Sequence, residues 1–371
     1  MKLPRNAQRW LPGYLSTRLA QRFQSAPSST IDVLFCIADH YEPDHHGAGR
    51  EQRLARVARW VDEYPRLADG LRDADGRPPR YSFFFPAEIY ARELVAPLAD
   101  LCHAGFGEFE VHLHHGHDTS AHLRETLTRF TTTLADAHGL LSRGPDGRLA
   151  YAFIHGDWAL DNSHGDDSQC GVNDEITVLR ETGCYADFTM PSVFYGSQSH
   201  LVNRVYFAVD DPARPASHLT GPLARAGVPA PAAGLLMVPG PLALNWRRRI
   251  RGIIPRIDGG AIDYRTPPTI DRFSRWLDAG VAVAGRPEWV FVKAHTHGAP
   301  EANADVMLGG AFRTMLAEAL ARYNDGQTMR LHFVTAREMA NIALAAIDGC
   351  AGNAGQFRDY RLRPLTPPAT T

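Results

Sequence analysis

The sequence predicts an α/β protein, a distorted (β/α) barrel with seven or eight parallel strands. Short apolar runs typical of buried strands alternate with segments whose apolar residues recur at helical spacing. Such alternation implies parallel strands joined by right-handed helical crossovers. After the first apolar run the chain reads Ala-Asp-His-Tyr-Glu-Pro, where a doubly wound sheet would carry a glycine-rich phosphate turn. A barrel is therefore favoured over an open sheet.

The expected strands are apolar runs bounded by turn residues, and the expected helices carry apolar residues three or four positions apart. In residues 51–70, for example, Val57, Trp60 and Tyr64 share a helical face, and Gly70 is a stop. We expect strands at residues 31–43, 80–86, 108–115, 149–158, 184–192, 288–295 and 329–335. We expect helices at residues 51–70, 87–105, 120–141, 173–183, 269–280, 304–323 and 336–347. The middle, about residues 203–260, is less regular.

Length and composition define the expected domains. A chain of 371 residues that is 44% hydrophobic can bury a large core. We expect a basic amphipathic segment at residues 1–30, the barrel at 31–347 and a tail at 348–371. The net charge of −2 gives no reason to expect a nucleic acid partner. The five cysteines show no short paired spacing, which argues against a disulfide framework and favours the cytoplasm.

The N-terminal segment has two interpretations. Apolar residues such as Trp10, Leu15 and Phe23 alternate with arginines, as in a helix that packs on its own domain or one that lies on a membrane surface. The segment lacks the apolar core of a secretory signal, and no stretch resembles a membrane span. We expect a cytoplasmic protein, with peripheral contact to the inner face of the membrane as the second interpretation.

Most of the 17 histidines gather in four short segments, each directly after an expected strand. The segments are residues 39–46, 112–122, 155–164 and 295–297. Active sites of parallel barrels lie at the carboxyl ends of the strands. Neutral imidazole and carboxylate groups are the ligands that Zn²⁺ and similar divalent ions prefer. The sequence therefore predicts a metal-dependent enzyme with one divalent ion, Zn²⁺ as first choice.

Side-chain alternation predicts which of these residues share a direction. Along an expected strand, residues two apart lie on one face. On this basis His112 and His114 point into the barrel mouth, as do His295 and His297, while the intervening apolar residues face helices. His155 and Asp157 share a face with Tyr151 and Phe153. We expect all four clusters to converge on one cavity.

Over roughly residues 31–345 the chain resembles the polysaccharide deacetylases of carbohydrate esterase family four, metal-dependent enzymes on a distorted (β/α) barrel. Ile37-Ala38-Asp39-His40 is similar to the family's Thr-Phe-Asp-Asp motif. The run from Glu110 to Asp118 is similar to its Glu-Ile-Gly-x-His-Thr-x-x-His motif. Residues 292–295 and 331–338 resemble its last two motifs. The Arg-x-Pro motif of the family is absent, which indicates a divergent branch.

The resemblance implies a function and its residues. It implies hydrolysis of an N- or O-acetyl group from an acetylated sugar or polysaccharide precursor. Asp39 would be the catalytic base at the metal centre, and His40 and His114 would bind the metal. The third ligand would be Asp118 or His117, and Glu42 could be a further ligand or brace the loop before Pro43. The general acid would be His295, with His297 as second choice.

Further residues suit a carbohydrate substrate. His155 and Asp157 could orient a group or bind a sugar hydroxyl, and Trp158 could stack on a sugar ring or pack in the core. Arg249 belongs to an arginine cluster that could bind a phosphate or an acidic glycan, or form a solvated face. A cytoplasmic enzyme would favour a nucleotide-linked or lipid-linked sugar.

Two other functions remain open. One is glycoside hydrolysis on a related barrel, for which Asp39 and Asp157 would supply the pair of carboxylates. The other is a degenerate barrel that binds sugar without turnover. Sensitivity to a chelator separates the first from a metal-dependent deacetylase, because a two-carboxylate hydrolase does not need a metal.

Overall fold

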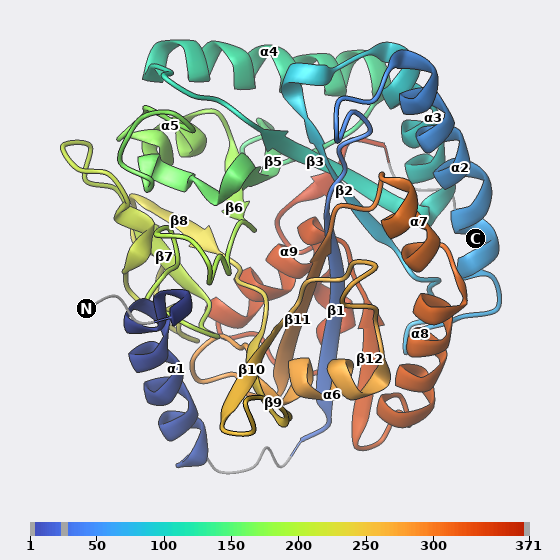
Figure 1. Cartoon of the computed structure of the whole chain (residues 1–371), viewed down its shortest axis with the longest axis vertical. Coiled ribbons are helices and arrows are strands. Elements are labelled where there is room, and N and C mark those ends of the chain that lie inside the picture. The colour runs from blue at the N-terminus through green and yellow to red at the C-terminus, as the bar shows by residue number, and fades with distance from the viewer. Residues whose placement is uncertain (1–3, 24–28, 367–371) are drawn as a thin grey trace.

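The computed structural model describes residues 4–23 and 29–366 as a mixed α/β fold with a mostly parallel central sheet (Figure 1). The strand order is β11-β1-β2-β3-β5-β6-β8-β7, and β12 also pairs with β1. These strands are β1 (Ile31–His40), β2 (Tyr81–Pro86), β3 (Gly107–Leu113), β5 (Leu149–His155), β6 (Cys184–Asp187), β7 (Tyr206–Val209), β8 (Gly234–Met237), β11 (Trp289–Thr296) and β12 (Met329–Phe333). Two-residue strands β4 (Ser142–Arg143) and β13 (Arg363–Pro364) extend the sheet beside β5.

The helices follow the predicted order. They are α1 (Ala7–Arg22), α2 (Arg50–Ala68), α3 (Arg92–Leu101), α4 (Ser120–His138), α5 (Glu175–Glu181), α6 (Ile270–Asp278), α7 (Glu301–Met307), α8 (Gly310–Tyr323) and α9 (Ala336–Ile347). The predicted α/β class is confirmed. The single helix expected at 304–323 is wrong, because the chain is interrupted at Leu308 and Gly309 between α7 and α8. The helix expected to reach residue 141 ends at His138, where Gly139 adopts a left-handed conformation with φ of 63°.

One strand pairing departs from the parallel pattern. β7 runs antiparallel to β8, with Tyr206 opposite Met237. Parallel neighbours need a crossover connection, which is usually an α-helix, and residues 210–233 between these two strands contain none. The seven strands predicted from the sequence all pair in parallel with one another, and the antiparallel strand β7 lies in the middle segment, for which no regular pattern was predicted.

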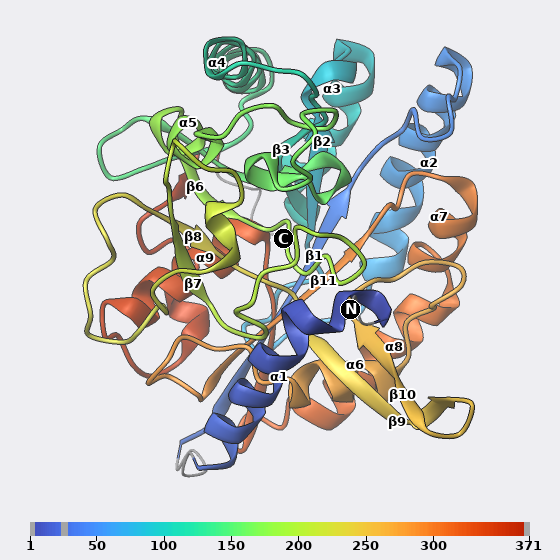
Figure 2. The same ribbon diagram turned by 60° about the vertical axis from the view of Figure 1, so that its left-hand side comes forward.

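A two-stranded hairpin formed by β9 (Leu242–Ile250) and β10 (Ile254–Gly259) was not predicted. It projects from the body of the protein beside α1 (Figure 2). Trp10 of α1 is buried in a small cluster with Val193, Val202 and Leu242. Leu15 and Leu19 of the same helix are exposed, so membrane contact through this segment stays a prediction. No helix in residues 4–23 or 29–366 is long and apolar enough to cross a bilayer.

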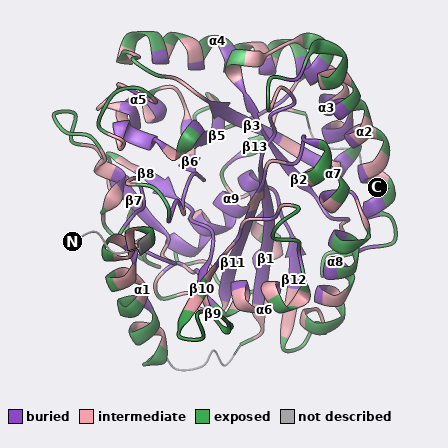
Figure 3. Cartoon of the chain, in the orientation of Figure 1, coloured by how far each residue is buried: buried purple, intermediate pink, exposed green. Residues whose placement is uncertain are grey.

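The sheet buries both of its faces. On one face, here called the α2 face, Val33, Phe35 and Ile37 of β1 pack with residues of α2, α3, α4 and α8. On the other, the α9 face, Leu34, Cys36 and Ala38 pack with α9 and with alternate residues of the other strands. Figure 3 shows the buried strands and the exposed outer sides of helices such as α2 and α8. The face on which a polar side chain lies therefore decides which groups it can meet.

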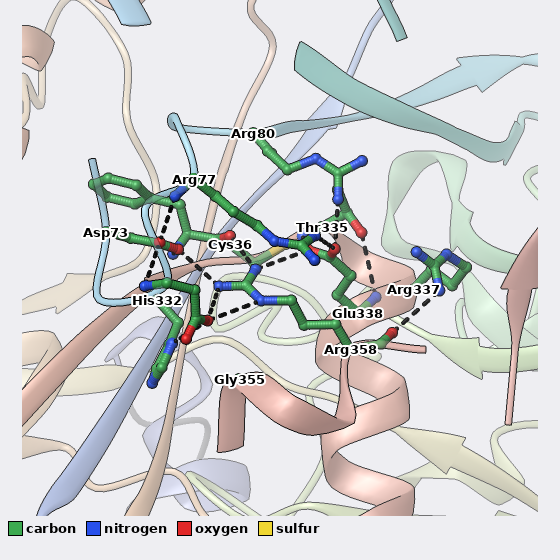
Figure 4. A network of polar contacts seen from close by, with 12 residues as sticks. Cys36, Asp73, Arg77, Arg80, His332, Thr335, Arg337, Glu338, Gly355 and Arg358 are labelled. Atoms are coloured by element: carbon green, nitrogen blue, oxygen red, sulfur yellow. Dashed lines mark hydrogen bonds and ion pairs between the residues drawn. The ribbon is translucent and has the colours of Figure 1, made fainter. Parts of the chain in front are cut away.

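Buried ion pairs connect α9 to the amino-terminal side of β2 (Figure 4). Glu338 is fully buried and pairs with Arg80, Arg77 and Arg358. It also completes a capping box with Thr335 at the start of α9. Three guanidinium groups thus surround one carboxylate, which fixes α9 against the sheet.

Candidate metal centre

Histidines from three strands meet at the carboxyl end of the sheet. His40 ends β1 on the α9 face, because it continues the alternation of Leu34, Cys36 and Ala38. His112 of β3 and His295 of β11 lie on the same face, opposite the apolar residues that contact the helices. The ring centroid of His40 lies 5.0 Å from that of His112 and 6.2 Å from that of His295. The prediction that strand ends bring imidazoles together is correct for these three.

Glu42 occupies the middle of this group. Its Oε1 atom lies 3.2 Å from Nε2 of His112 and 3.7 Å from Nε2 of both His114 and His297. Its Oε2 atom accepts a hydrogen bond from Nδ1 of His45 at 2.8 Å. We call His40, Glu42, His112, His114 and His297 the His40 centre. Within it, ligand atoms of His40, Glu42 and His112 all lie within 4.8 Å of one another.

Hydrogen bonds outside the centre orient two of its imidazoles. His112 donates from Nδ1 to the carbonyl oxygen of Ile154 at 2.8 Å, and His114 pairs through Nδ1 with Glu88 at 2.6 Å. Both rings therefore turn Nε2 toward Glu42. In a neutral ring this Nε2 carries a lone pair, which would face a carboxylate oxygen that is equally electron-rich. A positive charge between them, either a second ring proton or a metal ion, resolves the conflict.

Protonation states favour ligation by His40 and Glu42. Burial holds the pKa of His40 well below its usual value, and the neighbouring His297 and His112 lower it further. The ring is therefore neutral and can offer a lone pair to a cation. Burial alone would raise the pKa of Glu42, but its contacts with His112 and His45 hold it below its usual value. Glu42 is therefore a carboxylate near neutral pH.

A cavity of about 900 Å³ opens above the His40 centre. His40, Glu42 and His114 form part of its floor, together with His295 and His297. Other parts of its wall come from the loop after β5, the segment 191–195, the hairpin β9–β10, the loop 261–266 and residues 300–303. The cavity therefore gives a small molecule access to the imidazoles and the carboxylate.

Asp39 does not face this cavity. It continues the alternation of Val33, Phe35 and Ile37 on the α2 face and is fully buried. Its carboxyl group accepts hydrogen bonds from the hydroxyl of Tyr81 at 2.9 Å and from the backbone N–H of Gly298 at 2.7 Å. Burial raises its pKa well above the usual value, although both hydrogen bonds oppose the shift.

A second cluster of potential ligands lies on the opposite face of the sheet from the His40 centre. His155 lies on the α2 face with Tyr151 and Phe153, and its ring centroid is 4.8 Å from that of His115. His115 and His155 both contact Glu175, and Cys170 completes the set. We call these four residues the Cys170 group. The expectation of convergence on one cavity is wrong for His155, because β5 presents it to the opposite face, although Asp157 of the same segment lines the cavity.

Charges within the Cys170 group are strongly polarised. Burial opposes protonation of His115, but Asp118, Cys170 and Glu175 raise its pKa to about 12. Burial lowers the pKa of His155 to about 3, against the attraction of Glu175. The carboxylates around His115 therefore favour a positive charge, while His155 stays neutral.

The remaining predicted residues lie at several places. Asp118 pairs with His115 at 3.1 Å and with His122 at 2.7 Å, so it belongs beside the Cys170 group. His117 is exposed.

The residues predicted to bind substrate lie in and around the cavity. Asp157 and Trp158 line the cavity, and Trp158 stacks on Tyr195 with ring centroids 5.2 Å apart. Arg249 is exposed on β9, with its guanidinium 6.0 Å from the ring of Trp246. The two carboxylates considered for glycoside hydrolysis, Asp39 and Asp157, thus differ in that only Asp157 lines the cavity.

Sequence reasoning named Glu42 as a further ligand or as a brace of the loop before Pro43, without its central position, and it missed Glu88 as a part of the site. Glu42 lies two residues after His40, and side chains two residues apart in an extended segment lie on the same side. This spacing indicates that Glu42 lies beside His40. Glu88 follows β2 and reaches His114 from a different loop, so no local pattern indicates it. The role of His112 was visible only as alternation with Val111 and Leu113.

A third group, Asp73, Asp75 and His332, belongs to the network of Figure 4, in which Asp73 and His332 are labelled. Arg358 donates to Asp73 at 2.7 Å and to Asp75 at 2.8 Å. His332 bridges Asp75 and Asp32 through its two ring nitrogens, each at 2.9 Å. Protein cations already neutralise these carboxylates, so the group serves packing.

Gly156 offers a test of the His40 centre. A Cβ atom at this position would lie 2.2 Å from Cδ2 of His114, so Gly156→Ala must displace that imidazole. Loss of a correctly oriented ligand environment lowers metal affinity about 10–100-fold. We expect that loss in a competition titration against a chromogenic chelator. Gly49→Ala, whose Cβ meets nothing within 4 Å, is the matched control and should bind metal as the unmodified protein does.

The His40 centre is a set of nitrogen and oxygen ligands beneath an open cavity, in which His40, Glu42 and His112 are buried and His114 and His297 are partly exposed. This donor set fits a divalent ion such as Zn²⁺. A scan against protein-family models finds no match for the chain, and a search of the curated proteins finds none either.

Proposed function

We propose that the protein is a metal-dependent hydrolase that removes an acetyl group from an acetylated sugar. The observation that carries this proposal is the approach of three imidazole Nε2 atoms to Oε1 of Glu42 within 3.7 Å. The resemblance to polysaccharide deacetylases supplies the reaction, and the cavity above the site supplies the access.

His40, Glu42 and His112 would hold the ion, with His114 and His297 completing its surroundings. Zn²⁺ is the first choice because imidazole and carboxylate are its usual ligands in enzymes. Such an ion lowers the pKa of a water from near 16 to about 7 and polarises a carbonyl oxygen. The protein orients the ligands through Ile154 and Glu88, which keep the two Nε2 lone pairs directed at the site.

His295 and His297 would take the proton from the attacking water and pass it to the departing amine or alkoxide. Both line the cavity, and burial lowers the pKa of each below its usual value. Nδ1 of His295 makes no hydrogen bond within the described part of the chain. We assign Asp39 a positioning role, since its bond to Gly298 holds the turn that follows His297. This role replaces that of catalytic base, which the resemblance implied.

The cavity wall suits a sugar ring. Trp158 and Tyr195 stack at an interplanar angle of 15° and offer an aromatic surface within reach of His40, whose ring lies 5.7 Å from Trp158. The hairpin β9–β10, which contributes Leu242 and Ile257 to the wall, carries an exposed arginine cluster farther out. Guanidinium groups bind phosphate oxygens in pairs. This favours a nucleotide-linked or lipid-linked sugar as the substrate.

Trp158→Ala should weaken substrate binding more than chemistry. Loss of one aromatic stacking surface costs about 1–2 kcal/mol, which corresponds to an increase in KM of about 5–30-fold at nearly constant kcat. Initial rates over a range of substrate concentrations measure both constants. Tyr360→Ala removes an aromatic side chain that packs on Phe357, away from the cavity, and should leave KM unchanged.

We further infer that the sheet closes into a (β/α) barrel. The backbone N–H of Phe291 in β11 donates to the carbonyl of Val281 at 2.8 Å. Ala282 and Ala284 form isolated parallel bridges to Arg204 and Arg225, on segments next to β7. These short bridges support a connection between the two ends of the strand order.

The test is metal-dependent release of acetate. Protein stripped with a chelator should fold normally but release no acetate from N-acetylated amino sugars, and Zn²⁺ should restore the activity. Nucleotide-linked N-acetyl sugars form the second substrate panel, because the arginine-rich hairpin favours them. Full activity in the metal-free protein would refute the proposal, as would a metal-loaded protein that releases sugar instead of acetate.

A further inference from the structure

The Cys170 group is a set of potential metal ligands apart from the proposed active site. His155 and Glu175 are fully buried, Cys170 is 1% exposed, and the side chain of His115 is 6% exposed. None of the four lines the 900 Å³ cavity. The reaction proposed above uses none of them, so their proximity needs a separate explanation.

The distances from the Glu175 oxygen of this group are close to those of a tetrahedral site. Oε1 of Glu175 lies 3.1 Å from Nε2 of His115 and 3.5 Å from Nε2 of His155. Zinc bonds of 2.0–2.3 Å in tetrahedral geometry place ligand atoms about 3.3–3.8 Å apart. The four ligand atoms all lie within 4.8 Å of one another, so small adjustments are enough to surround an ion.

The ring of His155 is oriented as a ligand. Its Nδ1 lies 2.5 Å from the carbonyl oxygen of Gly156, which can only accept, so Nδ1 carries the proton. Nε2 then presents a lone pair toward Glu175 and has no hydrogen-bond partner among the described residues. A buried lone pair that faces a carboxylate is unfavourable without a cation between them.

Residues around the group hold its other ligands in place. Nδ1 of His115 lies 3.1 Å from Oδ2 of Asp118, an ion-pair contact without hydrogen-bond geometry that places a carboxylate behind the ring. The backbone N–H of Asp161 donates to Oε2 of Glu175 at 2.5 Å, which leaves Oε1 for the site. Cys170 is the only cysteine among the three groups of potential metal ligands in the described chain.

The loop 156–174 between β5 and α5 explains what such a site would do. Five of its non-glycine residues have positive φ angles between 50° and 57°, namely Asp157, Trp158, Asp161, Asn162 and Asp167. Left-handed conformations of this kind cost free energy and persist only where surrounding structure holds them. His155 precedes this loop, Cys170 lies within it, and Glu175 follows it. An ion bound by these residues would clamp the loop that presents Trp158 to the cavity.

We propose that His115, His155, Cys170 and Glu175 bind a second, structural Zn²⁺ ion. It cross-links the end of β3, the end of β5, the loop 156–174 and the start of α5. Each of the four positions of a tetrahedral structural site is filled by a protein ligand, so no position is open for substrate. This site is independent of the function proposed for the His40 centre.

Cobalt substitution tests the site, because a thiolate bound to Co²⁺ gives a near-ultraviolet charge-transfer band that nitrogen and oxygen ligands do not give. We expect the full chain to bind two Co²⁺ ions and to show this band. Cys170→Ser should lose the band and one ion. Cys102→Ser, at another buried cysteine, is the matched control and should retain both.

Two further variants keep the result decisive. Cys170→Asp supplies an oxygen ligand, so it should retain two ions without the band even if the serine variant does not fold. His112→Ala should lose one ion and retain the band, which separates this site from the His40 centre. An unmodified protein without the band, or a band that survives in Cys170→Ser, would overturn the proposal.

Discussion

His112→Ala should remove the metal from the His40 centre and reduce acetate release by about 10³-fold or more. The ring of His112 is fully buried, and its Nε2 lies 3.2 Å from Oε1 of Glu42. The alanine side chain removes this ligand atom and supplies none in its place. A divalent ion contributes several kcal/mol of transition-state stabilisation, and each 1.36 kcal/mol corresponds to a tenfold change in rate. Metal analysis and steady-state kinetics measure the two effects.

The control for this variant comes from the same segment of the chain. His117 lies five residues away, is exposed and belongs to neither the His40 centre nor the Cys170 group. His117→Ala should therefore retain its metal content and its kcat/KM. Equal activity of the two variants would remove His112 from the site. Loss of activity in His117→Ala with metal retained would return this residue to the ligand role that the resemblance implied.

Glu338→Gln should lower the free energy of unfolding by about 3–5 kcal/mol, the cost of leaving buried charges without their partner. Glutamine preserves the shape of the side chain and the capping position on α9, so the substitution removes mainly charge. Arg80 and Arg358, both almost fully buried, would then face a neutral amide. Urea unfolding measures the difference. Asp348→Asn, which weakens the partly exposed pair with Arg361, should cost less than about 1 kcal/mol.

The same variant should reveal the pH dependence of the network. Burial alone would raise the pKa of Glu338, but Arg80, Arg358 and other arginines lower it from 4.5 to about 2. A carboxylate with a lowered pKa stabilises the fold fully above its unfolded pKa and loses that contribution as the pH falls toward the folded value. The stability difference between the two proteins should therefore shrink between about pH 4.5 and pH 2. A constant difference over this range would contradict the assignment of charge to Glu338.

Side-chain alternation predicted correctly which face a histidine occupies in strands where the residues on one face are clearly apolar. In β3, Val111 and Leu113 contact the helices, so His112 lies on the other face, and in β11 Val292 and Ala294 identify His295 in the same way. In β5 the large residues Tyr151 and Phe153 also contact helices, which places His155 with them on the α2 face. The same rule that oriented β3 would have placed His155 correctly.

In β1 the sequence carries no such signal. All residues from Val33 to Ala38 are apolar, because both faces of this central strand are buried. Asp39 and His40 are therefore equivalent in the sequence, and the resemblance favoured Asp39 as the base. Only the packing of Trp60 and Tyr81 on one side, and of α9 on the other, separates their roles.

By itself, the sequence determined the α/β class, the order of the elements and the gathering of histidines at strand ends, because periodicity and turn residues are local properties. Only the tertiary structure decided that His40, Glu42 and His112 form one group while His115, His155, Cys170 and Glu175 form another. The division depends on which face of each strand meets α9 and which meets the outer helices. That choice is made by packing between segments far apart in the chain, so no local pattern contains it.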